Sequence, residues 1–382
     1  MFESIRNFIK EIKDSCALFS KNNKKARMIT FYSESDIYYQ YYEGVMGELL
    51  KDENIELCYI TSDINDSIFK KSGGRLKAFY IKSLLPFIMI YLDSKAFLMT
   101  MPDLGNYHIK RSINDTHYIY VFHAAGSAHL QYSRDAFNNY DAIFCVGAHH
   151  IEEIRKHEKL YGLKEKILVE CGYHRLEKIY TDHINYIKNA GTKNERKTVL
   201  IAPTWGRDNI MDSCLSNIID EIESIDRFDF VIRPHPEYIK RNPEKISDVR
   251  KRISKIKHIS LELDMLKDEN LHKADVLITD WSGIYLEYAL GTERPVLFIE
   301  TPCRIDNIEY KKLEIEPMEL ALRPKCGKIL EIKDIPLIIE TIGELIGNAP
   351  KYSRDIKEFR DRYLYNFLSS SPIAAKYIKN LL

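Results

Sequence analysis

Short apolar runs of strand length alternate with helix-length segments along most of the chain. The runs fall at 28–32, 55–60, 79–81, 96–100, 118–122, 142–146 and 167–171, and again at 199–202, 228–232, 276–279 and 296–299. Runs that are apolar at successive positions are typical of strands buried on both faces, and such strands joined by helices form parallel sheets. The sequence therefore predicts an α/β protein built from doubly wound parallel sheets.

The two series of runs are separated by a polar stretch, KNAGTKNER, at 188–196, which indicates a linker. A chain of 382 residues has room for two domains of ordinary size. We expect an N-terminal amphipathic helix at 1–25, a first domain at 26–190 and a second at 196–348. The remaining segment, 349–382, is expected to be helical and to pack back on the first domain.

The first residues place apolar side chains at helical spacing, ahead of a basic cluster. The apolar positions are Phe2, Ile5, Phe8, Ile9 and Ile12, and the basic ones are Lys21, Lys24, Lys25 and Arg27. One interpretation is a terminal helix that packs its apolar face on the first domain. The other is an amphipathic helix that lies against an anionic lipid surface.

Composition and charge exclude several classes of protein. The chain has 56 basic and 56 acidic residues, so no overall field favours nucleic acid. Its seven cysteines form no C-x-x-C pair, which fits a reducing compartment better than a disulfide framework. The longest apolar stretch, 84–92, is too short to span a bilayer, and no signal-peptide pattern is present. We expect a cytoplasmic protein, at most peripheral on the inner face of the membrane.

Polar residues collect where the predicted strands end. Ligands of doubly wound sheets bind outside the carboxyl ends of the strands. In the first domain these ends carry Asp103, His123, His149 and His174, and in the second they carry Thr204, Arg233, His235, Asp280 and Ser282. We expect two facing domains with a ligand cleft at these ends.

The segment 274–299 reads as strand, turn, helix and strand, with Asp280-Trp281-Ser282-Gly283 as its turn. A helix that begins at Ser282 directs its free N–H groups toward the end of the preceding strand, which creates an anion site. Gly283 allows a phosphate to approach the backbone, and Glu287 can accept hydrogen bonds from sugar hydroxyls. The alternative is a serine cap beside a solvent-facing glutamate.

The sequence Arg233-Pro234-His235-Pro236 follows the strand at 228–232. The prolines on both sides restrict the backbone and hold the imidazole in a stiff turn. A fixed cation beside that imidazole suits a pyrophosphate oxygen better than it suits a turn that only stabilises the fold.

Three segments in this order, RPHP at 233–236, TDWSG at 279–283 and RPVLF at 294–298, resemble the CDP-glycerol glycerophosphotransferase family of wall teichoic acid synthesis. The resemblance extends to the strand and A-P-T turn at 199–204 and to His123, which looks like the family's N-domain histidine. It covers about 118–299. It implies a GT-B fold with two Rossmann-type domains, a CDP-linked donor in the second domain and an acceptor near the first.

The resemblance also implies roles for single residues. Catalysis of phosphoryl transfer consists mostly of positioning and charge stabilisation. His123, with a pKa near neutrality, would take the proton of the acceptor hydroxyl, and His235 with Arg233 would steady the pyrophosphate. The remaining donor-binding candidates are Thr204, Asp280, Ser282, Gly283 and Glu287. Asp103 and His129 are the further acceptor-side candidates.

This chain departs from the family pattern in four respects. Ala124 follows His123 where the family has glycine, no lysine follows nearby, Asp280-Trp281-Ser282-Gly283 replaces D-Y-S-S, and Glu287 replaces the family's following aspartate. The expected activity is transfer of a polyol phosphate, such as glycerol phosphate, from a CDP-linked donor to a glycan or lipid-linked acceptor. The alternatives are a glycosyltransferase with a nucleotide-sugar donor, a UDP-sugar 2-epimerase, and a relative that binds nucleotide without turnover.

No tightly bound cofactor is expected. No pair of histidines has the H-x-x-x-H spacing of a helical zinc site, so we predict no protein metal site, although a divalent cation can accompany the donor. His149, His150 and His174 are expected to lie at the surface or to line the cleft.

Overall fold

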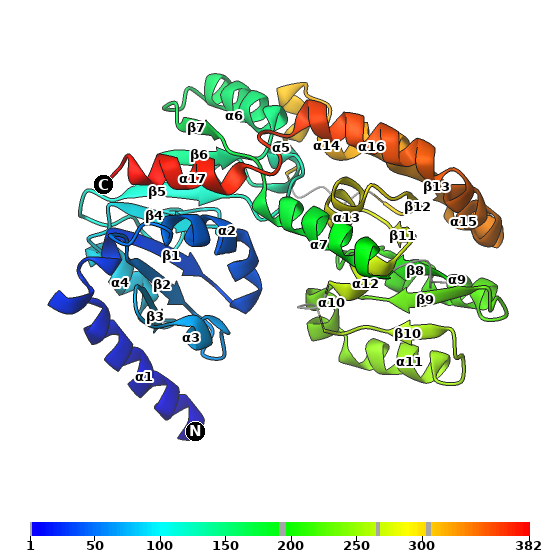
Figure 1. The fold of residues 1–382 in the computed structure, drawn as a ribbon, viewed down its shortest axis with the longest axis horizontal. Coiled ribbons are helices and arrows are strands. Elements are labelled where there is room, and N and C mark those ends of the chain that lie inside the picture. Colours follow the sequence, from blue (N-terminus) through cyan, green and yellow to red (C-terminus); the bar gives the residue numbers. More distant parts are fainter. Residues whose placement is uncertain (1, 191–195, 265–267, 303–306) are drawn as a thin grey trace. The chain divides into compact units, whose positions relative to one another are not determined.

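A computed structural model describes residues 2–190, 196–264, 268–302 and 307–382 (Figure 1). The chain divides into two compact units. The first comprises residues 1–175, 306–315 and 364–382, and the second comprises 176–305 and 316–363. Each unit contains one parallel sheet with helices packed against it.

The first unit is built on a seven-stranded parallel sheet in the order β3-β2-β1-β4-β5-β6-β7. Its strands are β1 (Ile29–Ser33), β2 (Leu57–Thr61), β3 (Leu76–Tyr80), β4 (Ala96–Met99), β5 (His117–Val121), β6 (Ala142–Cys145) and β7 (Ile167–Glu170). Strands β1, β2, β4 and β6 are buried at every residue, as expected for apolar runs inside a parallel sheet. Strand β7 lies at the edge and is largely exposed.

The helices of the first unit are α1 (Phe2–Leu18), α2 (Tyr39–Leu49), α3 (Ile68–Lys71), α4 (Leu85–Tyr91), α5 (Ala128–Gln131), α6 (Ala148–Tyr161) and α17 (Ser370–Lys379). The last of these comes from the C-terminal end of the chain and packs beside α2. Ala374 and Ile378 of α17 are buried in one core cluster with Val45 and Leu49 of α2. Helix α17 therefore returns to the first unit, whereas α16 (Ala349–Tyr363), from the same expected segment 349–382, belongs to the second unit.

The second unit is built on a six-stranded parallel sheet in the order β10-β9-β8-β11-β12-β13. Its strands are β8 (Lys197–Ile201), β9 (Phe228–Ile232), β10 (Ile259–Leu261), β11 (Val276–Thr279), β12 (Val296–Glu300) and β13 (Gly327–Glu331). Numbered from β8, this is the strand order 3-2-1-4-5-6 of a Rossmann sheet. The two edge strands, β10 and β13, were not predicted, because neither carries an apolar run of strand length.

The helices of the second unit cover both faces of its sheet. They are α7 (His174–Ala190, except for its first two residues), α8 (Ile210–Ser213), α9 (Leu215–Ile222), α10 (Pro236–Arg241), α11 (Pro243–Ile253), α12 (Glu269–Lys273), α13 (Ile284–Thr292), α14 (Met318–Cys326), α15 (Ile338–Gly347) and α16 (Ala349–Tyr363). Apolar residues of α9 and α15 pack in one cluster with β8, β9 and β11.

In both sheets the strand order reverses beside the first strand of the unit. The reversal lies between β1 and β4 in the first unit and between β8 and β11 in the second. At such a switch point the connections on the two sides run to opposite faces of the sheet, which leaves a crevice at the carboxyl ends of the strands. The predicted donor-binding residues follow β8, β9 and β11, so the topology brings them to one edge.

The boundary between the units falls between Arg175 and Leu176, at the start of α7. The linker expected at 188–196 lies later in the chain, and its residues 191–195 are outside the described residues. The difference has a packing reason. Leu176 and Ile179 are fully buried, and Ile179 lies against Gly291 of α13, where a Cβ would come within 2.6 Å of it.

Helix α1 packs against the edge strand β3, but not through its apolar stripe. Ile5, Phe8, Ile9 and Ile12 are 43–53% exposed, and the side chain of Phe2 is outside the described part. The buried side chains on α1 are instead Glu11, Ser15 and Leu18. The interpretation in which the apolar face packs on the first domain is wrong.

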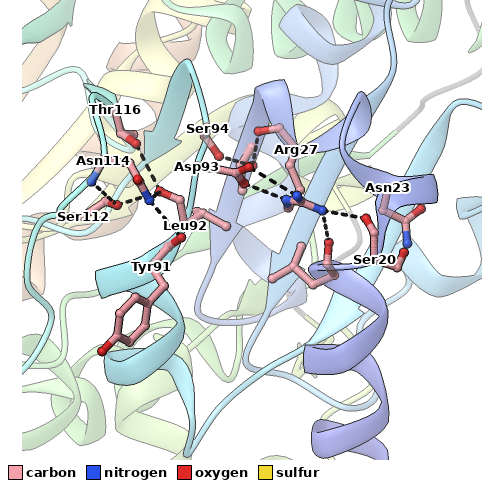
Figure 2. A network of polar contacts seen from close by, with 12 residues as sticks. Ser20, Asn23, Arg27, Tyr91, Leu92, Asp93, Ser94, Ser112, Asn114 and Thr116 are labelled. Carbon is pink, nitrogen blue, oxygen red and sulfur yellow. Dashed lines mark hydrogen bonds and ion pairs between the residues drawn. The ribbon is translucent and has the colours of Figure 1, made fainter.

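Arg27 was grouped with the exposed basic cluster, and this was wrong because its guanidinium is buried (Figure 2). Its Nε donates to Asp93 at 2.8 Å, and its Nη1 donates to the carbonyl oxygens of Leu18 and Ser20, the latter at 3.0 Å. The hydrogen bond from Arg27 lowers the pKa of Asp93. This network ties the end of α1 to the amino ends of β1 and β4.

In the described part of the chain, no helix is both long enough and apolar enough to cross a membrane.

Candidate active site

The loops after β8 and β11 are joined by the carboxylate of Asp280. Ile201 pairs with Ile278 in the sheet, so both strands end at the same level. Asp280 is fully buried; its Oδ1 accepts the backbone N–H of Thr204 at 2.8 Å and its Oδ2 that of Ile210 at 3.0 Å. Burial raises the pKa of Asp280, while these N–H groups oppose the shift. Asp280 therefore fixes the position of Thr204 from across the switch point.

The turn after β11 delivers Ser282 and Gly283 to the N-terminus of α13. The helix begins at Ile284 with Gly283 as its N-cap, two residues later than predicted. Ser282 is buried, whereas Gly283 is exposed and has an ordinary φ of −60°. A Cβ on Gly283 would meet no atom within 4 Å. The fold itself does not need glycine here, so the open space in front of the helix N-terminus is available to a ligand.

His235 caps the next helix along this edge. Its Nδ1 accepts the backbone N–H of Glu237 at 3.1 Å, which leaves the ring proton on Nε2 in the neutral imidazole. The ring of Trp205, from the loop after β8, lies 6.0 Å from the imidazole. The guanidinium of Arg241 lies 4.6 Å from the Trp205 ring. His235 is thus oriented by its hydrogen bond to the first turn of α10.

Arg233 is buried and faces carboxylates. Its Nε lies 3.6 Å from Glu262 and its Nη2 lies 3.9 Å from Asp268. Its backbone N–H donates to Ile201 at 2.8 Å, which ties the RPHP turn to β8. Burial raises the pKa of Glu262, and the cation of Arg233 opposes this. The positive charge of Arg233 is therefore partly compensated by carboxylates inside the second unit.

Glu287 lies half-buried on the first helical turns of α13. Together the second unit assembles Thr204, His235, Ser282 and Gly283 on the loops of three adjacent strands, β9, β8 and β11. Hydroxyl groups, helix N–H groups and an imidazole on one edge form an arrangement that can hold an anion such as a pyrophosphate.

His123 follows β5 in the first unit and lies among aromatic rings. The rings of Tyr38, Tyr41 and Tyr132 lie 5.8, 6.1 and 6.1 Å from its imidazole. Burial lowers the pKa of His123 to about 4, although a backbone hydrogen bond with Thr100 opposes the shift. The expected pKa near neutrality is therefore wrong, and His123 is neutral at pH 7.

A small pocket lies beside this aromatic cluster. Tyr41 lines it, together with Tyr173, His174 and Ser371. The Tyr41 and Tyr173 rings stack at 6.3 Å, and the Ser371 hydroxyl lies 3.0 Å from His174 Nδ1. His174 thus lines a pocket within the first unit.

The two other acceptor-side candidates are already engaged within the first unit. Asp103 has a positive φ of 64°, and its Oδ1 accepts hydrogen bonds from Ser133 at 2.9 Å and Asn106 at 3.1 Å. His129 is buried, with Nδ1 3.2 Å from Glu153 and Nε2 3.3 Å from the carbonyl of Ile315. Since both nitrogens of His129 have neighbours, its geometry favours an internal role.

His149 and His150 were expected at the surface or along the cleft, and this expectation is wrong. Both are buried at the start of α6, where they bond the backbone of the loop that follows His123. A signal was present in the sequence: Glu153 and Ile154 repeat at helical spacing after the two histidines, which places all four on one buried face.

Among the described residues, no group of three or more His, Cys, Asp or Glu side chains could hold a metal ion.

A family model described as CDP-Glycerol:Poly(glycerophosphate) glycerophosphotransferase matches residues 104–366, more than two thirds of the chain. The chain belongs to this family. The match confirms the resemblance and the enzyme class predicted from the RPHP, TDWSG and RPVLF segments. No curated protein sequence matches the chain.

Solved structures of similar fold cover nearly the whole chain. The wall teichoic acid polymerase TagF has a TM-score of 0.63 at 16% identity, covering 100% of this chain and 98% of that chain. A putative UDP-N-acetylglucosamine 2-epimerase from Listeria monocytogenes has a TM-score of 0.59 at 13% identity, covering 92% and 94%. A glycosyltransferase from Rickettsia africae ESF-5 has a TM-score of 0.52 at 11% identity, covering 92% and 97%.

At these identities the structural likeness concerns the fold alone, and it confirms two parallel α/β domains of GT-B type. Epimerases and glycosyltransferases share that fold, so the fold does not decide between activities. The family match does, and it favours transfer of glycerol phosphate from CDP-glycerol over the alternatives.

We predict that Gly283→Ala weakens donor binding without weakening the fold. The added methyl group meets open space in the structure, so the free energy of unfolding should change by less than about 0.5 kcal/mol. The KM for CDP-glycerol should rise at least about tenfold, since the methyl group occupies the path of a phosphate. Gly343→Ala is the control, because Gly343 on α15 also faces open space. An unchanged KM would place the phosphate elsewhere.

We also predict an unusual pH profile. With a pKa of about 4, His123 stays unprotonated down to pH 5, and it loses its function as a base only when it is protonated at lower pH. The acid limb of kcat/KM should therefore fall below pH 5, well under the value of about 6.5 for an unperturbed histidine. Initial rates between pH 4 and 8 measure it. A midpoint near 6.5 would mean that another group limits the reaction.

Proposed function

We propose that the enzyme transfers glycerol phosphate from CDP-glycerol to a hydroxyl group of a glycan acceptor and releases CMP. The family match supports the donor and the reaction class. The assignment of residues rests on the geometry at the switch point of the second unit, where three loops come together. There Asp280 holds the Thr204 loop against the turn of Ser282 and Gly283.

The donor binds to the second unit in this proposal. The N-terminus of α13, with Ser282 and Gly283, holds the phosphate that carries glycerol, because free N–H groups and the positive helix end stabilise negative charge. The Nε2–H of His235 and the hydroxyl group of Thr204 donate to the pyrophosphate. Arg233 adds positive potential from inside, and Glu287 binds the ribose hydroxyls.

The reaction is an in-line displacement at the phosphorus that carries glycerol. The acceptor oxygen forms a bond to this phosphorus while the bond to the CMP oxygen breaks. His123 takes the proton of the acceptor hydroxyl, which general-base catalysis makes worth roughly 10²–10⁴-fold in rate. As CMP leaves with its negative charge, the donors on the second unit stabilise that charge.

A divalent cation would reach the site on the pyrophosphate of the donor in this proposal, because pyrophosphate oxygens are good ligands for Mg²⁺. The tyrosines around His123 suit a sugar-bearing acceptor, since aromatic faces pack against the apolar faces of sugar rings.

We predict different effects for the two histidines. His123→Ala should reduce transfer at least about 10²-fold and leave binding of CDP-glycerol nearly unchanged, because the base contacts the acceptor. His235→Ala should weaken both. Single-turnover assays with labelled CDP-glycerol measure transfer, and calorimetry measures binding. Near-normal turnover of His123→Ala would remove it from the base role, and turnover of a UDP-sugar in place of CDP-glycerol would overturn the function.

We further propose that the enzyme is cytoplasmic and contacts the inner face of the membrane through α1. Helix α1 is attached to the first unit by its acidic face: Glu11 Oε1 accepts the backbone N–H groups of Lys82 at 2.6 Å and Leu84 at 2.7 Å. Asp14 Oδ2 accepts the N–H of Tyr80 at 2.8 Å. The apolar stripe is thereby turned outward.

Basic residues follow this outward stripe. Lys21 and Lys24 are exposed just beyond α1, and Lys25 is exposed beside Glu56 at 3.6 Å. An exposed apolar stripe next to cations fits the surface of an anionic bilayer, where each cation contributes about 1 kcal/mol. A few cations and one short stripe give weak attachment that salt reverses.

We predict that replacing Ile5, Phe8, Ile9 and Ile12 by serine abolishes co-sedimentation with anionic vesicles at low salt. The substitutions keep Glu11 and Asp14, so the helix stays attached, which a deletion of 1–25 would not ensure. The control replaces Ile329 and Leu337, which are 50% exposed in the second unit. Transfer to a lipid-embedded acceptor should fall while transfer to a soluble analogue is kept. Equal sedimentation of the two variants would contradict the proposal.

A further inference from the structure

The loop that follows His123 carries only small side chains. Its residues are Ala124-Ala125-Gly126-Ser127-Ala128. Short side chains limit the contacts that can hold a loop, so hydrogen bonds to its backbone contribute strongly to its position. The position of the His123 imidazole depends on that backbone.

Three buried side chains from the first two turns of α6 supply these bonds. His149 Nε2 lies 3.1 Å from the carbonyl oxygen of Ala125, and His150 Nε2 lies 2.8 Å from that of Gly126. Glu153 Oε2 accepts the N–H groups of Ala128 at 2.6 Å and His129 at 3.2 Å. Two carbonyl groups and two N–H groups of one short loop are therefore bound from a single helix.

The chemistry of each group matches its partner. His150 Nδ1 accepts the N–H of Val146 at 3.2 Å, so the ring proton lies on Nε2, where it is donated to Gly126. Burial lowers the pKa of both His149 and His150, which keeps the rings neutral. Glu153 supplies the acceptor that the two imidazoles do not, and it binds N–H groups at the start of α5.

The same helix also contacts the residue before His123. The ring of His150 stacks on that of Phe122 with a centroid distance of 3.8 Å. The chain is therefore held on both sides of His123: stacking fixes Phe122 before it, and hydrogen bonds fix the loop after it. Packing alone does not explain three polar side chains at these positions, because burying them costs free energy that apolar residues of similar size would not cost.

We propose that His149, His150 and Glu153 are positioning residues for glycerol phosphate transfer, which fix the loop 124–128 and thereby the imidazole of His123. The proposal rests on the proposed role of His123 as the base. These three residues act through the loop and leave donor binding in the second unit untouched. A displacement of the base by about 1 Å costs roughly 10²-fold in rate.

The test compares His150→Asn with His150→Gln. The amide of asparagine matches the Nδ1 position and cannot reach Gly126, whereas the longer glutamine places an N–H donor near the position of Nε2. We expect kcat to fall about 10- to 100-fold in His150→Asn and to recover at least partly in His150→Gln. The KM and calorimetric Kd for CDP-glycerol should stay within about twofold in both.

A matched control is Asp93→Asn, in the polar network at the opposite, amino end of the same sheet (Figure 2). Loss of the Asp93 charge weakens its ion pair with buried Arg27, so this variant lowers Tm as a general defect of the fold would. All variants are assayed at least 10 °C below the lowest Tm. We expect Asp93→Asn to keep its kcat, although its Tm falls.

The outcomes separate the two proposals. Wild-type kcat in folded His150→Asn, with His123→Ala inactive, would overturn the positioning role and leave the base in place. An active His123→Ala would overturn the proposed base itself. Equal losses of kcat in His150→Asn and Asp93→Asn would show that kcat falls because the fold is less stable, and this would also overturn the proposal. Should His150→Asn not fold, His149→Ala, which removes one hydrogen bond, carries the same test.

Discussion

The carboxylate of Asp280 connects the two loops on which the donor site is built. It is buried, no cation among the described residues is paired with it, and the N–H groups of Thr204 and Ile210 stabilise its charge. A buried carboxylate that lost these bonds would carry a large desolvation cost, so the loops cannot separate while the charge remains. The shape of the edge that carries Ser282 and Gly283 therefore depends on one side chain that need not touch a substrate.

In the first unit, a loop at the same edge of the sheet is held by different groups. There the loop after β5 is bound by neutral imidazoles and a carboxylate from α6, and in the second unit the loop after β8 is bound by Asp280 from β11. Both loops leave a parallel sheet at its carboxyl edge, where the ladder of backbone hydrogen bonds ends and the N–H and carbonyl groups need new partners.

In the second unit the sequence predicted the buried inner strands and missed the two edge strands. Apolar runs such as 276–279 and 296–299 became central strands, and the family and GT-B fold are confirmed. The edge strands β10 and β13 were missed because a strand with one neighbour does not need an apolar run; Lys328 and Ile329 of β13 are exposed.

Side-chain environments were the least predictable part of the site. The order of strands brings Thr204, His235 and Ser282 to one edge, which local sequence could indicate because each follows an apolar run. The pKa of His123, the burial of His149 and His150 and the burial of Arg27 depend on contacts between distant segments, such as that of Arg27 with Asp93. No short-range pattern encodes such contacts. The roles of the individual site residues stay predictions.

The division of the chain has a consequence for the order in which the protein is made. The second unit draws on a range that ends at residue 363, whereas the first needs 364–382 as well, including α17, which covers α2. A ribosome that builds the chain from its N-terminus completes the sheet of the first unit by residue 170 and the helix that seals its core last. Until then Val45 and Leu49 lack their partners Ala374 and Ile378, so the half of the protein that is synthesised first is the half that finishes folding last.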